Sequence, residues 1–318
     1  MWHTEWTATY TVSYTSEAIM APTESVKDAA EPPMIIATAA PLHGPLRVIV
    51  VGAGGTGARV VPPLAQMLRP GDSMVIVDHD IVEDRNLARQ HFSERDIGRH
   101  KALVLSERYQ RQGISVQAYA HQLQPATNSG FITSLPNMRG LNAQIVVGCV
   151  DNWHARKAIQ DLVTRLPIAA AWIDVGNETR GGQVLMSLRA WMVRHSMGQV
   201  EPSPIFLNAM LAMPQLLRAQ PWKCIPCGIQ NAAGAATCQG CKQPEASCGQ
   251  QVDMQTVMVN HMAACSAINC VSWLMLGIPF TSCGAFFSTL NTMQPIRLRE
   301  WLPSSRYLVP DTTFAIAE

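Results

Sequence analysis

The sequence contains little charge and few aromatic side chains for its length. Of its 318 residues, only 15% are Asp, Glu, Lys or Arg and 6% are Phe, Trp or Tyr, and the formal net charge is +1. So small a net charge gives no reason to expect general binding to nucleic acid or to an acidic membrane surface. With so few charged side chains, much of the surface is expected to be neutral or covered by a partner.

A secretory signal is also missing, because residues 1–20 lack a basic start followed by an apolar core. The nine cysteines are many for a cytosolic chain. Several of them fall in short pairs, which favours metal and thiolate chemistry over disulfides. We therefore expect a cytoplasmic protein.

Residues 254–296 contain no Asp, Glu, Lys or Arg. Within this segment, residues 256–276 are long enough to cross a membrane as a helix. Polar side chains interrupt it at Asn260, His261, Ser266, Asn269 and Ser272, and Gly277 and Pro279 end it. We therefore expect a buried or dimer-interface helix and no membrane partner.

Strand-like and helix-like segments alternate from Leu46 onward. Strands are expected at 47–51, 74–77, 115–118, 144–148 and 169–174, and helices at 56–68, 101–112 and 153–165. Such alternation predicts an α/β fold with a doubly wound, Rossmann-like, mostly parallel sheet and helices on both faces. Pro62 and Pro63 lie in the first helix, so we expect it to start late, kink or be partly irregular.

A glycine-rich turn follows the first expected strand. Apolar residues 48–51 precede Gly52, Gly54, Gly55 and Gly57, where the chain enters a helix. This arrangement lets backbone N–H groups gather around a phosphate at a helix N-terminus.

Charged side chains downstream of the turn indicate which kind of nucleotide would bind there. Asp78 ends the second strand, where a carboxylate can accept hydrogen bonds from ribose hydroxyls, as it would also in a nicotinamide dehydrogenase. Arg89 and Lys101 supply cations that suit a triphosphate better than hydride transfer. Asp151 ends another strand and could hold Mg²⁺. Amides that could orient the nucleotide are Asn86 and Asn152.

Five motifs together resemble the ThiF/MoeB/HesA family of adenylating enzymes, which includes the activating enzymes for ubiquitin-like proteins. They are the glycine turn, Asp-x-Asp at 78–80, Asn-Leu-x-Arg-Gln at 86–90, Gly-x-x-Lys at 98–101 and Cys-x-Asp-Asn at 149–152. The resemblance implies ATP and Mg²⁺ as cofactors, with Asp151 on the metal and Arg89 and Lys101 as catalytic cations. The cofactor-binding positions it carries over are Gly52, Gly54, Gly55, Gly57, Asp78, Asp80, Asn86, Arg89, Gln90, Lys101, Asp151 and Asn152.

The same resemblance implies a reaction and a partner. The C-terminal carboxylate of a small ubiquitin-like or sulfur-carrier protein would attack the α-phosphate of ATP, and the enzyme would act as a homodimer. The rest of the sequence resembles one branch of the family, the ThiF-like proteins of PRTRC cassettes. The segments that carry this likeness are 172–177, 182–184, 247–248 and 259–260.

A compact cysteine module forms a second signal. Cys224 and Cys227, then Cys238 and Cys241, make two Cys-x-x-Cys knuckles that can close a tetrahedral Cys₄ zinc site. Residues 222–241 resemble the Ran-binding-protein (Npl4-type) zinc finger, whose relatives bind ubiquitin or single-stranded RNA. Neither recognition surface is evident here, so we interpret the finger as structural or as a docking insert, the one place where nucleic acid could bind.

Cys248 is the candidate nucleophile. It lies just before the apolar helix, where a helix N-terminus lowers the pKa of a thiol. In the ubiquitin-like-activating relatives a cysteine in such a position takes the acyl group as a thioester. The remaining cysteines, which are expected to be small core residues, are Cys149, Cys265, Cys270 and Cys283.

These signals divide the chain into five parts: a flexible tail at 1–44, an adenylation domain at 45–200, a linker at 201–221, the zinc finger at 222–243, and a C-terminal extension of helix and short strands at 244–318. Two other interpretations stay open. The protein could be a non-catalytic scaffold whose finger binds a protein or RNA partner, or an NAD-dependent oxidoreductase.

Overall fold

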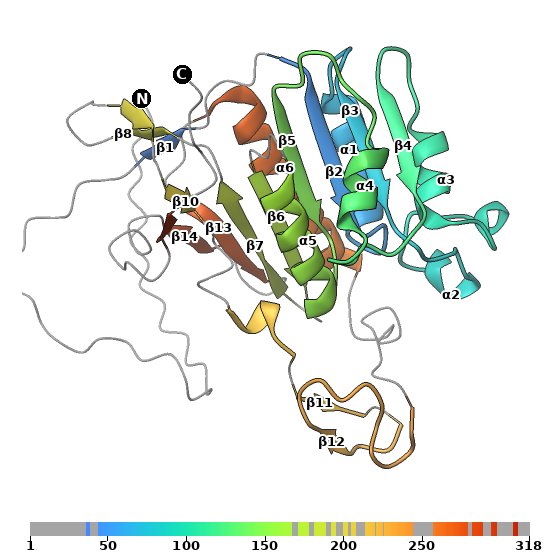
Figure 1. The fold of residues 1–318 in the computed structure, drawn as a ribbon. Coiled ribbons are helices and arrows are strands. Elements are labelled where there is room, and N and C mark those ends of the chain that lie inside the picture. The colour runs from blue at the N-terminus through green and yellow to red at the C-terminus, as the bar shows by residue number, and fades with distance from the viewer. Residues whose placement is uncertain are drawn as a thin grey trace, which may run out of the picture. The chain divides into compact units, whose positions relative to one another are not determined.

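A computed structural model of the chain describes a large part of its sequence (Figure 1). The described residues are 36–38, 44–166, 171–177, 181–188, 192–194, 200–202, 205–207, 214–219, 221–224, 226–243, 257–278, 282–288, 294–297 and 308–310. All of them belong to one unit, Pro33–Glu318. Most of the predicted tail at 1–44 therefore lies outside the described residues.

Five parallel strands form one side of a ten-stranded sheet, as counted over the described residues. Their order from the edge of the sheet is β4-β3-β2-β5-β6, with bounds β2 (Leu46–Val51), β3 (Ser73–Val77), β4 (Ser115–Tyr119), β5 (Ala143–Gly148) and β6 (Ala171–Asn177). Every residue of β2, β3 and β5 is buried, as expected for strands covered on both faces. The predicted doubly wound α/β fold is confirmed.

Antiparallel strands extend the sheet beyond β6. β7 (Gly181–Leu188) pairs with β6, and β13 (Ser282–Ser288) pairs with β7 and β14 (Gln294–Arg297). Short strands β10 (Ile205–Leu207) and β15 (Leu308–Pro310) pair with each other, and β10 also touches β7. The extension thus joins segments from before and after the cysteine module.

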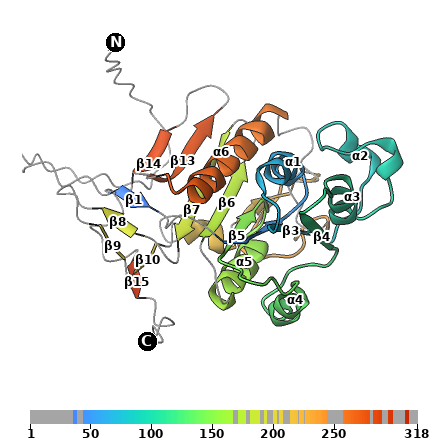
Figure 2. The ribbon, with the colours of Figure 1, turned by 90° about the horizontal axis from the view of Figure 1, so that it is seen from above.

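Helices cover both faces of the sheet (Figure 2). α1 (Gly57–Met67) and α6 (Val257–Leu276) pack together on one face, and α4 (Asn128–Ser134) and α5 (Trp153–Arg165) on the other. α3 (Lys101–Arg108) packs on β3 and β4. Short helical turns are α2 (Asp84–Leu87), η1 (Glu94–Asp96) and η3 (Pro214–Leu217).

The apolar segment folds as α6, which is long and apolar enough to cross a membrane by length and composition alone. In the structure it packs on β6, β7 and α1. The face that it buries repeats about every fourth residue, at Val259, Ala263, Ala267, Val271 and Leu274. Small residues on this face let the helix lie close to the sheet.

Two smaller sheets complete the described elements. β1 (Ile36–Thr38), β8 (Met192–Arg194) and β9 (Val200–Pro202) form one. β11 (Trp222–Lys223) and β12 (Gln230–Asn231) form the hairpin of the cysteine module. The carboxyl ends of β2 and β5 mark the point where the main sheet reverses its order, and doubly wound sheets bind ligands at such a point.

Candidate nucleotide site and cysteine cluster

The glycine turn lies at this reversal point and is held by close backbone contacts. Gly52 has φ +94°, and a Cβ there would lie 2.5 Å from the carbonyl oxygen of Cys149. A Cβ at Gly57 would lie 1.8 Å from the carbonyl oxygen of Gly52. At Gly54, by contrast, no described atom lies within 4 Å of the Cβ position. The turn is therefore closely packed on the protein side and open at Gly54.

The N-terminus of α1 follows the turn without a side-chain cap. In the described structure, Thr56 makes no capping hydrogen bond and the first turn holds no acidic residue. The N–H groups of Ala58 and Arg59 donate to the backbone carbonyl oxygens of Gly54 and Thr56, no side chain accepts from the first turn, and the helix dipole favours an anion there. The turn fits a phosphate group.

Asp78 holds the turn from the end of β3. Its Oδ2 accepts a hydrogen bond from the backbone N–H of Ala53 at 2.5 Å, and its Oδ1 accepts one from that of Asp80 at 2.8 Å. Burial raises the pKa of Asp78, whereas the Ala53 N–H and the charge of Lys101 oppose the rise. The side chain predicted to bind ribose thus also fixes the turn.

Lys101 and Asp80 form the charged pair of the site. The Lys101 Nζ donates to Asp80 Oδ2 at 2.9 Å, and the lysine is 5% exposed. Burial works to raise the pKa of Asp80, but the hydrogen bond and charge of Lys101 outweigh it, so that this pKa is lowered. A second hydrogen bond, from the Lys101 backbone N–H to the Asp80 carbonyl oxygen, fixes the start of α3 beside β3.

The Asn-Leu-x-Arg-Gln motif lies around α2. Asn86 accepts a hydrogen bond from the backbone N–H of Glu83 at 2.9 Å, so that its amide caps the short helix. Asn86, Arg89 and Gln90 are all buried. The Gln90 Oε1 is buried without a hydrogen-bond partner among the described residues. The motif is therefore part of the protein interior here, and direct nucleotide contacts by it stay predictions.

Asp151 and Asn152 follow β5 and are exposed. The Asn152 Oδ1 caps α5 by accepting from the Ala155 N–H at 2.9 Å, and its Nδ2 donates to Asp151 Oδ1 at 3.1 Å. Asp151 thus presents a carboxylate, oriented by a neighbouring amide, that could hold Mg²⁺.

A buried ion pair that the sequence does not predict lies behind the turn. Arg156 Nε lies 3.0 Å from Asp174 Oδ2, and an Arg156 Nη2 donates to the Val150 carbonyl oxygen at 2.9 Å. Burial raises the pKa of Asp174, and Arg156 opposes this rise. Burial, followed by the charge of Asp174, raises the pKa of the Cys149 thiol, so that this cysteine stays protonated and unreactive.

A groove of about 500 Å³ runs between α1 and α6. Among its lining residues are Arg59, Pro63 and Met67 of α1 and His261, Cys265 and Ile268 of α6. Arg59 donates from Nη1 to the Gly55 carbonyl oxygen at 2.6 Å and from Nε to His261 Nε2 at 3.2 Å. Burial and the charges of Arg59 and His91 lower the pKa of His261, which keeps its ring able to accept this bond.

Three of the cysteine predictions can be compared directly with the structure. Cys149 is partly buried and packs against the core. Cys270 is buried, as predicted. Cys265 is exposed, so its assignment to the core is wrong, because it lies on the side of α6 that faces the groove and not the sheet. The candidate nucleophile Cys248 and the side chain of Cys283 lie outside the described residues.

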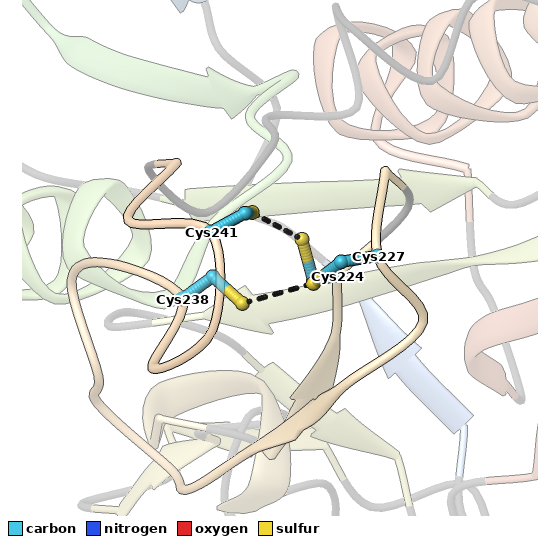
Figure 3. A group of neighbouring side chains, drawn as sticks. All are labelled: Cys224, Cys227, Cys238 and Cys241. Atoms are coloured by element: carbon cyan, nitrogen blue, oxygen red, sulfur yellow. Dashed lines mark hydrogen bonds between the residues drawn. The ribbon is translucent and has the colours of Figure 1, made fainter.

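The four cysteines of the module converge (Figure 3). All four sulfur atoms lie within 4.8 Å of one another, with 3.4 Å between Cys224 and Cys241 and between Cys227 and Cys238. Backbone N–H groups, that of Cys241 foremost, lower the pKa of Cys238 to about 6. Four thiols at this separation could hold zinc as a closed tetrahedral site.

Hydrogen bonds connect the two knuckles of the module. The buried Asn231 accepts from the Gln239 N–H at 2.9 Å and donates to the Ile229 carbonyl oxygen at 3.1 Å. The Trp222 Nε1 donates to the Ala235 carbonyl oxygen at 2.8 Å. Trp222 and Asn231 therefore have structural roles in the module.

Comparison with known proteins gives a family-level match and more distant relatives. The sequence profile described as the ThiF family matches residues 44–293. Ubiquitin-like modifier-activating enzyme 5 from Dictyostelium discoideum is 31% identical over 139 residues, 41% of this chain and 35% of that protein. The NEDD8-activating enzyme E1 catalytic subunit from Saccharomyces cerevisiae is 29% identical over 145 residues, 43% of this chain and 46% of that protein.

Adenylyltransferase and sulfurtransferase MOCS3 from Mus musculus is 34% identical over 117 residues, 36% of this chain and 23% of that protein. The chain thus matches less than half of the length of each of these curated relatives. Among solved structures, E. coli MccB with ATP is similar with a TM-score of 0.44 and 16% identity, over 79% of this chain and 63% of that one.

Proposed function

The chain belongs to the ThiF family, and from this premise we propose that it uses ATP and Mg²⁺ to adenylate the C-terminal carboxylate of a small ubiquitin-like or sulfur-carrier protein. One observation carries the proposal. An uncapped glycine turn, the carboxylate of Asp78 and the Lys101–Asp80 pair lie at the carboxyl ends of neighbouring parallel strands. The names of the relatives support the class of substrate.

In the proposed reaction a carboxylate oxygen of the carrier protein attacks the α-phosphorus of ATP. The bond from this phosphorus to the bridging oxygen breaks, and pyrophosphate leaves. Lys101 has three N–H donors and uses one on Asp80, which leaves donors for phosphate oxygens. With Arg89, it would stabilise the charge that develops, and loss of one such donor costs about 3 kcal/mol, or roughly a hundredfold in rate.

The exposed carboxylate of Asp151 would hold Mg²⁺. When bound, the ion neutralises phosphate charge and orients the triphosphate. Asn152 would keep the carboxylate in place through its hydrogen bond to Asp151 Oδ1.

A second step would transfer the acyl group to Cys248. Its thiolate would attack the carbonyl carbon of the acyl adenylate, forming a thioester and releasing AMP, while the thiol proton goes to solvent. Support for this step comes from the resemblance to the activating enzymes, because α6 begins at Val257, nine residues after Cys248, too far for its N-terminus to act on the thiol.

We further propose a homodimer and a zinc-bound finger that is either structural or a docking insert. No residue of α6 is acidic or basic apart from His261, and the exposed fractions of Met258 and Leu276 are 61% and 68%. An uncharged apolar surface of this kind suits a subunit interface. Light scattering that gives the mass of one chain at micromolar concentration would refute the dimer.

The test of the proposed activity is ATP–pyrophosphate exchange by the full-length, zinc-loaded protein with candidate small carrier proteins. We expect Lys101→Ala to lower the exchange rate by roughly a hundredfold. Lys157→Ala is the matched control, because Lys157 is exposed on α5 and contacts the ring of Trp153. Cys248→Ala should leave exchange unchanged and remove any thioester-linked adduct.

Several outcomes would contradict parts of this proposal. Exchange that survives Lys101→Ala would remove Lys101 from the chemistry, and an adduct in Cys248→Ala would exclude that cysteine as the acceptor. Tight ATP binding without exchange for any carrier would favour a scaffold. Binding of NADH but not of ATP would favour an oxidoreductase.

A further inference from the structure

Asn260 of α6 lies directly over the glycine turn, although it is 204 residues from Thr56 in the sequence. It is 1% exposed. Its Oδ1 accepts hydrogen bonds from Thr56 Oγ1 at 3.2 Å and from Asn177 Nδ2 at 2.7 Å. The Asn177 amide donor sets which way the Asn260 amide faces, because the one Thr56 hydroxyl proton is shared between Asn260 Oδ1 and Asn177 Oδ1.

The other end of this amide is directed at the turn. A Cβ on Gly55 would lie only 2.7 Å from Asn260 Nδ2, so the amide occupies the space that any larger residue at position 55 would need. The Nδ2 atom is buried and has no hydrogen-bond partner in the described part of the chain. A buried donor without an acceptor is unfavourable, which calls for an acceptor that arrives with a ligand.

The neighbouring atoms indicate the charge of that ligand. The N-terminus of α1 starts here without a side-chain cap or an acidic residue, and Gly54 leaves the approach open. Uncapped N–H groups and an amide donor together suit an anion. In contrast, the Asn260 oxygen is already used by Thr56 and Asn177 and is not available to a cation.

We propose that Asn260 is a phosphate-binding residue of the nucleotide site, whose amide Nδ2 donates to a phosphate oxygen held at the Gly54–Gly55 turn. This inference rests on the proposed function, because it needs a nucleotide with phosphates at this turn. It adds to the site a residue from the C-terminal part of the chain. Thr56 and Asn177 act as positioning residues that keep the donor directed at the turn.

A purely structural role for Asn260 makes a different prediction. If the amide only held α6 against the turn, its loss would weaken the binding of ATP and of adenosine equally. It would also lower the melting temperature of the nucleotide-free protein. If the amide binds a phosphate, its loss weakens the binding of ATP and leaves the binding of adenosine nearly unchanged, because adenosine lacks the phosphates. The comparison of these two ligands therefore separates the two roles.

The experiment measures dissociation constants of ATP·Mg²⁺ and adenosine by calorimetry on the full-length, zinc-loaded protein. Asn260→Asp keeps the shape but replaces the donor with a carboxylate oxygen, and Asn260→Ala removes the amide without adding charge. We expect ATP affinity to fall about tenfold or more in both variants, with the larger loss in Asn260→Asp, and adenosine affinity to change less than about twofold. Asn269→Asp is the matched control, because Asn269 is an exposed asparagine of the same helix.

Each result has a defined meaning. Wild-type affinity for ATP in Asn260→Ala, or an equal loss for both ligands in a variant that is still folded, would overturn the role of Asn260 and leave the proposed function intact. If a variant is unfolded by its melting curve, the other variant decides. No binding of ATP by the wild-type protein would overturn the proposed function and this inference together.

Discussion

The side chains of the candidate site differ in how much of their hydrogen-bonding capacity is already taken up by other protein groups. Both carboxylate oxygens of Asp78 accept backbone N–H groups, and the amide of Asn152 caps a helix. Asp151 and Lys101 retain capacity for a ligand, the first through its exposure and the second through its remaining N–H donors. The groups that orient the site are thus distinct from those that could act on a substrate.

The lowered pKa of Asp96 makes the stability of the fold depend on pH. Its Oδ2 accepts from the Ser93 N–H and hydroxyl, both at 2.8 Å, and from Arg108 at 2.6 Å. Burial works to raise the pKa of Asp96, but these donors outweigh it and the pKa is lowered. A carboxyl group whose pKa is lower in the folded state stabilises the fold above its unfolded pKa of about 3.9. That contribution is lost as the pH falls through the lower, folded pKa.

We therefore expect Asp96→Asn to lower the free energy of unfolding at pH 7 and to flatten its decline below about pH 4. Urea unfolding of wild type and variant at pH 7, 4 and 3 checks this. Glu94→Gln, an exposed acid in the same turn, is the control and should leave both quantities nearly unchanged. Equal pH dependence in wild type and Asp96→Asn would contradict the expectation.

At the scale of elements, the turn between β2 and α1 contains glycines with different roles. Gly57→Ala would place a Cβ 1.8 Å from the Gly52 carbonyl oxygen, a backbone atom that cannot move aside. We expect it to destabilise the fold by about 1–3 kcal/mol. Gly54→Ala meets no atom within 4 Å and should change stability by less than about 0.5 kcal/mol.

The two substitutions can be told apart by measuring chemical unfolding and ATP affinity on both variants. Gly54→Ala adds a methyl group on the open side of the turn. We therefore expect it to lower the affinity for ATP and to leave the unfolding midpoint unchanged. A large loss of stability in Gly54→Ala, or none in Gly57→Ala, would show that the turn is packed differently.

The sequence predicts those elements whose residue pattern lies within one short segment of the chain. The runs of β-branched residues in β2, β3 and β5, and the turn glycines, predict the sheet and its reversal point because their pattern is local. The first helix is expected to start late, kink or be partly irregular. The late start is wrong, since α1 begins at Gly57 directly after the turn, and the other two alternatives stay predictions. Pro62 and Pro63 lie within that helix, whose packing against α6 stabilises it in spite of the missing N–H groups.

Other parts of the site depend on contacts between distant segments. Asn260 meets Thr56 only because α6 packs against α1, and Arg156 meets Asp174 only because α5 covers β5 and β6. Nothing in the local sequence marks these pairs. For the same reason Cys265 was assigned to the core, since periodicity in a uniformly apolar helix does not tell which side faces the sheet.

At the scale of the molecule, the cysteine module and the sheet have separate means of stabilisation. The hydrophobic core of the described residues joins the sheet and its helices, and its members include none from residues 222–243. The module instead contains four thiols and a few hydrogen bonds around Asn231. If the four thiols bind zinc as proposed, so small a segment would depend on that metal for folding.

We therefore expect a strong zinc chelator to unfold residues 222–243 and to leave the sheet folded. Hydrogen exchange measured by mass spectrometry should show faster exchange in peptides from the module and unchanged exchange in peptides from β2 and β5. Cys224→Ser should reproduce the effect without chelator. Loss of protection in β2 or β5 would mean that the module and the sheet unfold together.

The position of α6 over the glycine turn also bears on how the protein is synthesised. The strands around the reversal point are all made before residue 178, but the helix that covers the turn ends at Leu276. A nascent chain on the ribosome therefore holds an uncovered turn until most of its length has emerged. If the turn binds a nucleotide as proposed, ribosome-bound chains halted before α6 should retain that nucleotide more weakly than the complete chain does.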